Sequence, residues 1–178
     1  MSEQPRILDP HPRVRAILDA AVERLAAAGA RTEALGEFIP AQRKLLITRK
    51  ARLIDRGRVW RLGVFLLSAD GVLRLVGITT RAVAPGWPGH QSLSAETRRE
   101  YRDAAHRGPF REGETINFDA PVLDLDERSL AHSRGVFFLR EGLPVVRWSA
   151  DAPADSARDL GDYLAERIAL LIDPPAGA

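Results

Sequence analysis

The sequence predicts an α+β fold: a mostly antiparallel sheet of five to seven strands, with N- and C-terminal helices packed on it and a helical insertion. Apolar stripes with helical spacing occupy both ends of the chain. Between them the pattern changes to short apolar runs joined by turn residues, which is typical of hairpins. A long stretch, residues 81–113, separates two of these runs. With 178 residues and no evident linker, we expect one domain over residues 1–178.

The first predicted element is a helix over residues 11–28. Asp9 and Pro10 are suited to begin it, and Gly29 is suited to end it. Residues 30–41 show no clear period, so we expect them to be irregular. The apolar stripe of the helix consists of Val14, Ile17, Leu18, Ala21, Val22, Leu25 and Ala28.

The strands are expected after residue 43. The clearest one, over residues 58–68, is apolar on both sides in its centre, which indicates a central strand or the wall of a curved sheet. Asp70-Gly71 and Glu141-Gly142 are hairpin turns. The predicted strands cover residues 51–55, 58–68, 72–80, 115–120, 135–140 and 143–149. Residues 44–48 are a strand or a helix, and residues 122–125 are a further candidate strand.

Two further helices complete the prediction. The insertion begins with a turn-rich part and continues as a helix capped by Ser94 and ended by Gly108. The apolar seam of this helix is thin, so we expect it to touch the sheet weakly. The last helix is predicted over residues 156–172, with Asp155 as its N-cap.

The charged residues are unevenly distributed. The chain has 26 basic residues, 24 of them arginine, against 24 acidic ones, for a net charge of +2. Residues 43–61 carry eight basic groups and one acid, whereas residues 112–178 carry 13 acids and six arginines. The two segments either neutralise each other in the fold or steer a partner, and the sequence leaves both readings open.

Composition and motifs exclude several classes of chemistry. Without cysteine there is no disulfide, zinc-thiolate site, iron–sulfur cluster or thiol nucleophile. No apolar run is long enough for a membrane span and no export signal begins the chain, so we expect a soluble, cytoplasmic protein without a membrane partner. The glycine-rich nucleotide loops, the nucleophile elbow and Ser-x-x-Lys are absent. We expect no cofactor and no metal, although residues 124–127 hold carboxylates suited to a hard cation.

The candidate site residues form two groups. The first would line a cleft beside the insertion, where Asn117 and Asp119 alternate with apolar neighbours and so face away from the core. The second lies in the basic segment and would bind an anion. The candidate ligand-binding residues are Trp87, His90, Tyr101, Asn117 and Asp119. The candidate anion-binding residues are Arg49, Lys50, Arg52 and Arg58.

Three stretches carry a resemblance: Arg58-Val59-Trp60-Arg61-Leu62-Gly63-Val64, the Asp70-Gly71 turn and Gly113-Glu114-x-x-Asn117-Phe118. Together they resemble small uncharacterised proteins of high-GC actinobacteria, over most of the chain from residue 43 onward. Some members of that group are labelled glutaminase. The resemblance therefore implies an amide hydrolase and assigns no catalytic residue.

Three functions follow as hypotheses. The first is binding of a small ligand or a partner protein, because the chain is well patterned and lacks a local catalytic motif. The alternative is an amide hydrolase with its site near residues 86–119. Nucleic-acid association through residues 43–61 ranks behind both, because charge on edge strands also prevents aggregation. An exposed edge strand makes a homodimer an open alternative, and whether the protein is an enzyme is also open.

Overall fold

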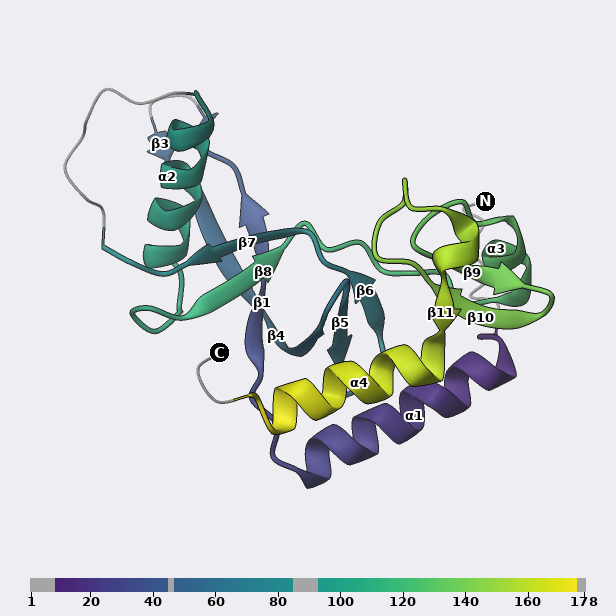
Figure 1. Cartoon of the computed structure of the whole chain (residues 1–178). Helices are drawn as coiled ribbons and strands as arrows, with labels where there is room; N and C mark the ends of the chain where they lie inside the picture. The colour runs from purple at the N-terminus through teal and green to yellow at the C-terminus, as the bar shows by residue number, and fades with distance from the viewer. Residues whose placement is uncertain (1–8, 45–46, 85–92, 176–178) are drawn as a thin grey trace. The chain divides into compact units, whose positions relative to one another are not determined.

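The computed structural model describes residues 9–44, 47–84 and 93–175 and confirms the α+β fold (Figure 1). Its helices are α1 (Pro12–Ala27), α2 (Leu93–His106), α3 (Glu127–His132) and α4 (Leu160–Ile172), with a short 3-10 turn η1 (Ala154–Ser156). Its strands are β1 (Glu33–Ile39), β2 (Gln42–Lys44), β3 (Ile47–Arg49), β4 (Arg52–Leu62), β5 (Phe65–Ser68), β6 (Leu73–Leu75), β7 (Ile78–Arg81), β8 (Thr115–Phe118), β9 (Phe137–Arg140), β10 (Leu143–Val146) and β11 (Arg158–Asp159).

The chain divides into two compact units. Unit 1 comprises the chain up to Ala30, Asp70–Val72 and the chain from Val122 onward; unit 2 comprises Arg31–Ala69 and Leu73–Pro121. A single domain over residues 1–178 stays a prediction. None of the helices in the described ranges has both the length and the apolar character that crossing a membrane requires.

Unit 2 is built on a six-stranded sheet with the order β6-β5-β4-β1-β8-β7. Its strand pairs are antiparallel except for β1 with β8, which run parallel. The prediction of a mostly antiparallel sheet is thereby confirmed. On one face the sheet packs on α2 through a buried core. This core consists of Ala34, Ala51, Leu53, Ala82, Ala104, Ala105, Ile116 and Phe118.

The prediction that residues 30–41 are irregular is wrong. This range contains β1, which lies in the interior of the sheet between β4 and β8. Gly36 interrupts the apolar pattern that would otherwise reveal the strand. A Cβ atom at Gly36 would lie 2.8 Å from Cγ2 of Ile116, so the spacing between β1 and β8 requires a glycine. The strand predicted over 58–68 is likewise two strands, β4 and β5, which turn at Gly63 with a φ of +65°.

The expected weak contact of the insertion helix is also wrong. Ala104 and Ala105 of α2 are fully buried, and Tyr101 packs edge-on against the rings of Phe38 and Phe118. Small side chains let the helix approach the sheet closely, so a thin apolar seam suffices to bury that face. The helix begins at Leu93, one residue before the predicted cap.

In unit 1, α1 packs against α4, and α4 also packs against β10 and β11 of the three-stranded sheet β11-β10-β9 (Figure 1). The predicted helix starts need correction. The α1 helix begins at Pro12 with His11 as N-cap, and α4 begins at Leu160, where Asp159 accepts hydrogen bonds from the first-turn amides. The strand predicted over residues 122–125 is wrong, because only Val122 forms a bridge there. In the run of carboxylates at 124–127, Asp126 accepts a hydrogen bond from the Ser129 amide and caps α3.

Candidate functional site

The sheet of unit 2 curls so that the segment after β8 returns to the edge strand β6. The amide of Leu75 donates to the carbonyl of Pro121 at 3.0 Å, and Nη1 of Arg74 donates to the carbonyl of Ala120 at 3.3 Å. Because β8 and β6 are four places apart in the strand order, these contacts require strong curvature. The inner face holds a second apolar cluster. It contains Leu35, Val59 and Leu66, with Val76 and Ala120 packed on them.

A groove of about 380 Å³ opens beside this cluster. Its apolar lining comes from β1 and from the segment after β8, and its polar lining contains two arginines and two carboxylates. The lining residues are Leu35, Gly36, Glu37, Arg56, Arg74, Asp119 and Ala120.

A β-bulge in β4 places Arg56 at the groove. Leu35 pairs with Gly57 and Gly36 pairs with Asp55, so Arg56 is the extra residue of the bulged strand. Gly57 has a φ of +112°, and its amide donates to Oδ1 of Asp55 at 2.8 Å. The bulge redirects Arg56, whose Nε donates to Glu37 at 2.7 Å across the strand pair.

Arg74 and Asp119 line the groove from β6 and from the end of β8. The Nε–H of Arg74 is buried and has no hydrogen-bond acceptor among the described residues, while Nη1 is held by Ala120. Asp119 has a φ of +50°, which is uncommon for a non-glycine residue, and its exposed carboxylate has no ion pair within the described ranges. The lining residues of the groove therefore include one with a buried, unpaired donor and one with an exposed carboxylate.

A polar network crosses the inner face of the same sheet. Asn117 is fully buried, and its Nδ2 donates to Oε2 of Glu33 at 2.6 Å. Its Oδ1 accepts from Nη1 of Arg61 at 2.8 Å and from the hydroxyl of Thr79 at 3.2 Å. Each polar atom of the Asn117 side chain is thus satisfied, which indicates a role in holding four strands together.

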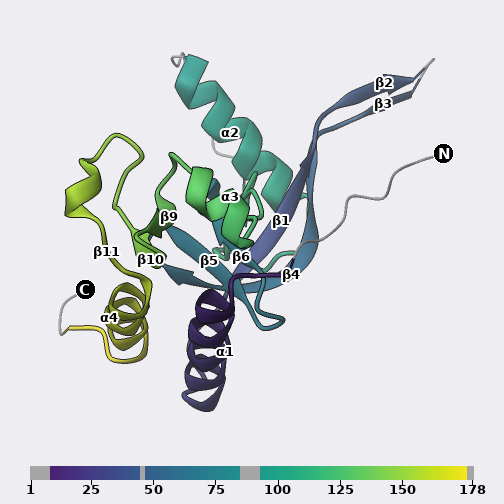
Figure 2. The same cartoon turned by 90° about the vertical axis from the view of Figure 1, so that its right-hand side faces the viewer.

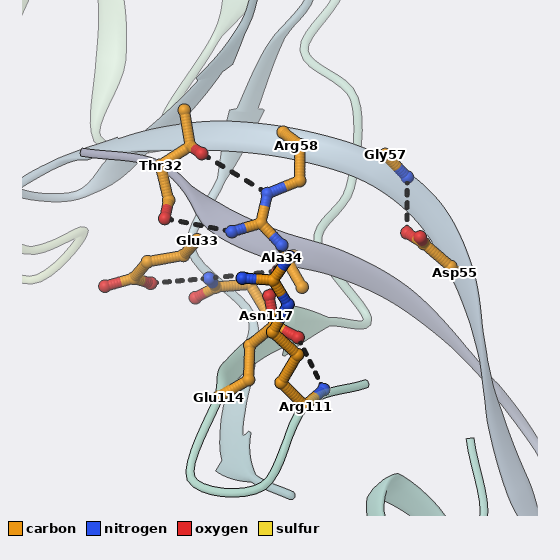
Figure 3. A network of polar contacts seen from close by, with 9 residues as sticks. All are labelled: Thr32, Glu33, Ala34, Asp55, Gly57, Arg58, Arg111, Glu114 and Asn117. Atoms are coloured by element: carbon orange, nitrogen blue, oxygen red, sulfur yellow. Dashed lines mark hydrogen bonds and ion pairs between the residues drawn. The ribbon is translucent and has the colours of Figure 1, made fainter. Parts of the chain in front are cut away.

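A second network joins the start of β1 to β4 and to the loop before β8 (Figure 3). Arg58 donates to Oγ1 and to the carbonyl of Thr32 at 3.2 and 3.1 Å, and it pairs with Glu114. The other oxygen of Glu114 accepts from the amide of Arg111 at 2.9 Å. These hydrogen bonds, first that of Arg58 and then that of Arg111, hold the pKa of Glu114 below its ordinary value of 4.5.

The lowered pKa predicts a pH-dependent stability. A carboxylate whose pKa is depressed by folding stabilises the native state above its ordinary pKa, and that contribution is lost as the pH falls through the lowered value. The Glu114→Gln variant should be less stable than the parent at neutral pH, and the difference should shrink below pH 4.5. Urea unfolding between neutral pH and about pH 3 measures it. In an Arg58→Met background, the change in stability caused by Glu114→Gln should depend much less on pH. A pH dependence as large as in the parent background would show that Arg58 does not cause the lowered pKa of Glu114.

The structure separates the candidate ligand-binding residues. Trp87 and His90 lie outside the described residues, so a hydrolase site near them stays a prediction. Tyr101 packs in the core on the α2 side of β8, whereas Asn117 points to the opposite face because successive residues of a strand alternate. Asn117 is buried in its network, and of the three candidates that the structure describes only Asp119 lines the groove.

The basic segment is divided in two. Its C-terminal arginines are paired: Arg56 with Glu37, Arg58 with Glu114, and Arg61 with Asn117 and Thr79. Among these partners, Glu37 lies in β1, whereas Glu114, Asn117 and Thr79 do not. Glu114 is the only one of them that is an acid from residues 112–178, the acid-rich part of the chain. The candidates Arg49, Lys50 and Arg52 are exposed and have no ion pair among the described residues.

Sequence reasoning missed Arg56 and Arg74 as groove residues. A signal for Arg56 was present, since a glycine two residues after an aspartate within a strand pattern is typical of a bulge. No comparable sequence signal marks Arg74, because its position at the groove depends on the return of the chain from β8 to β6.

Comparisons with protein-family models, with curated proteins and with solved structures gave no match. The geometry of the site alone therefore supports the functional assignment. In the part of the chain that the structure describes, no three histidine, aspartate or glutamate side chains are arranged to hold a metal ion.

Proposed function

We propose that the protein binds a small ligand carrying a carboxylate or phosphate group in the groove of unit 2. The observation that carries this proposal is Arg74, a lining residue of the groove whose buried Nε–H has no acceptor among the described residues. A buried donor without a partner costs about 1–3 kcal/mol, so a shift of the Arg74 side chain that brings its Nε–H to a ligand oxygen recovers that energy.

The guanidinium of Arg74 is already oriented for this role. Its Nη1 is held by the carbonyl of Ala120, which limits the freedom of the side chain before a ligand arrives. The edge formed by Nε and the second terminal nitrogen matches the two oxygens of a carboxylate or phosphate. Arg56 lines the same groove, but Glu37 holds its side chain and offsets its charge, so Arg74 supplies the attraction for the anionic group.

The remaining lining constrains the rest of the ligand. Leu35 and Ala120 offer apolar surface to a short carbon skeleton. The free carboxylate of Asp119 offers an acceptor for a hydroxyl or ammonium group. A ligand with an anionic end and a donor group, such as a hydroxy acid, an amino acid or a sugar phosphate, matches this combination.

Thermal shift with a panel of small carboxylates and phosphates, followed by titration calorimetry, tests the proposal. We expect at least one compound to raise the melting temperature of the parent protein, and we expect Arg74→Met to weaken its binding by about tenfold or more, since a charge-assisted hydrogen bond contributes about 1.5–3 kcal/mol. Arg107→Met is the matched control, because Arg107 also donates to a backbone carbonyl, that of Ala51, but does not line the groove. A ligand that binds the Arg74→Met variant as tightly as the parent would refute the site.

A further inference from the structure

Strands β2 and β3 form a two-stranded arm that continues beyond the ends of β1 and β4 (Figure 2). Residues 38–54, which include this arm and its base, contain five basic residues and no acidic one. The arm is therefore positively charged along its length.

The charge of the arm is not neutralised by the fold. Arg43, Arg49, Lys50 and Arg52 are exposed, and none of them has an ion pair among the described residues. The arginines further along β4 are instead held by acceptors from β1, β7, β8 and the loop before β8. Four cations thus remain available to a partner at one place on the surface of unit 2.

The register places two of these cations, Arg43 and Arg49, on opposite faces of the arm. Gln42 pairs with Arg49, and Arg43 pairs with Thr48, so Arg43 and Arg49 point to opposite faces. From the pair Ile39–Arg52 to the pair Lys44–Ile47 the arm spans five residue steps, roughly 17 Å at about 3.4 Å per residue.

We propose that this arm binds double-stranded nucleic acid by lying in a groove of the duplex, with its basic side chains on the phosphates of both walls. The major groove of DNA is about 12 Å wide and admits a two-stranded β-ribbon. A ribbon with cations on both faces meets phosphates on both sides, whereas a flat acidic protein surface would contact only one face. This binding is independent of the ligand groove, since none of the four residues lines it.

Fluorescence anisotropy of the full chain with a labelled DNA duplex of about 20 base pairs tests the inference. Four phosphate contacts predict that log K falls with log salt with a slope of about −3.6, which is an affinity loss of about 150-fold between about 50 and 200 mM salt. The arm variant replaces Arg43, Arg49, Lys50 and Arg52 with glutamine. It should reduce the slope to near zero and bind at least about 100-fold more weakly at the lowest salt concentration.

A control variant of equal charge change separates the arm from net charge. It replaces the exposed residues Arg15, Arg24, Arg31 and Arg128 with glutamine. It should retain the parent slope, and circular dichroism should show that both variants are folded.

Three results would each overturn the inference. The first is absence of duplex binding by the parent at about 50 mM salt. The second is an arm variant that binds like the control variant. The third is equal affinity of the parent for polyglutamate or for phosphatidylserine vesicles, which would show that the arm recognises an acidic protein or a membrane surface instead.

Discussion

Replacement of Gly77 by alanine is expected to destabilise the protein by about 3 kcal/mol or more, or to prevent folding. A Cβ atom at Gly77 would lie 2.1 Å from the carbonyl oxygen of Asp119 and 2.5 Å from that of Phe118. Both obstacles are backbone atoms at the end of β8, so no side-chain rotation relieves the overlap. The β7–β8 pair would have to open at its end, next to the pair Ile78–Phe118. Urea unfolding followed by circular dichroism measures the loss.

Gly135→Ala is the matched control for this substitution. The nearest atom to a Cβ there is Oγ of Ser133 at 3.5 Å, an ordinary van der Waals distance, and no positive φ is involved. We expect the control to change the free energy of unfolding by less than about 1 kcal/mol. A Gly77→Ala protein as stable as the control would show that the residue before β7 does not lie as close to the end of β8 as described.

The second large effect is expected for Asn117→Leu, at about 3 kcal/mol of lost stability. Leucine has a similar size but offers neither the donor to Glu33 nor the acceptor for Arg61, and Asn117 is fully buried. Two charged groups would lose a partner at once, and desolvated groups without partners are costly. Urea unfolding of the variant and of the double variant with Glu33→Gln measures how much of the loss comes from the Glu33 contact.

Thr79→Val is the control in the same network. The hydroxyl of Thr79 contacts Arg61 and Asn117, but the residue is exposed, so water replaces the lost hydrogen bonds. We expect a loss below about 1 kcal/mol. If Asn117→Leu were equally mild, the network would be a surface feature without a structural role.

The elements that are local in sequence were predictable. The helix α1 follows from its apolar stripe, and the hairpin of β9 and β10 follows from the turn at Glu141-Gly142, where both residues have a positive φ. In each case the residues that decide the structure are neighbours in the chain, so period and turn chemistry suffice.

The elements that depend on distant residues were not predictable. The glycine that hides β1 is required by Ile116, some 80 positions later, and the burial of α2 depends on how closely two alanines let it approach the sheet. The candidate site shows the same limit. Asp119 was predicted because it follows an alternating strand, whereas Arg74 joins it only through the curvature of the sheet.

The parallel pairing of β1 with β8 has a consequence for the nascent chain. On the ribosome, β1 can pair with β4 as soon as residue 62 is available, but its other edge stays open until residue 118 has been made. During that interval the strand that becomes central is an edge strand, exposed to pairing with other chains. Glu33 and Glu37 place negative charge on that strand throughout its exposure. Gly36 also shortens the apolar run of β1. The same residues that let β1 fit beside β8 therefore make β1 a poor template for aggregation before β8 has been synthesised.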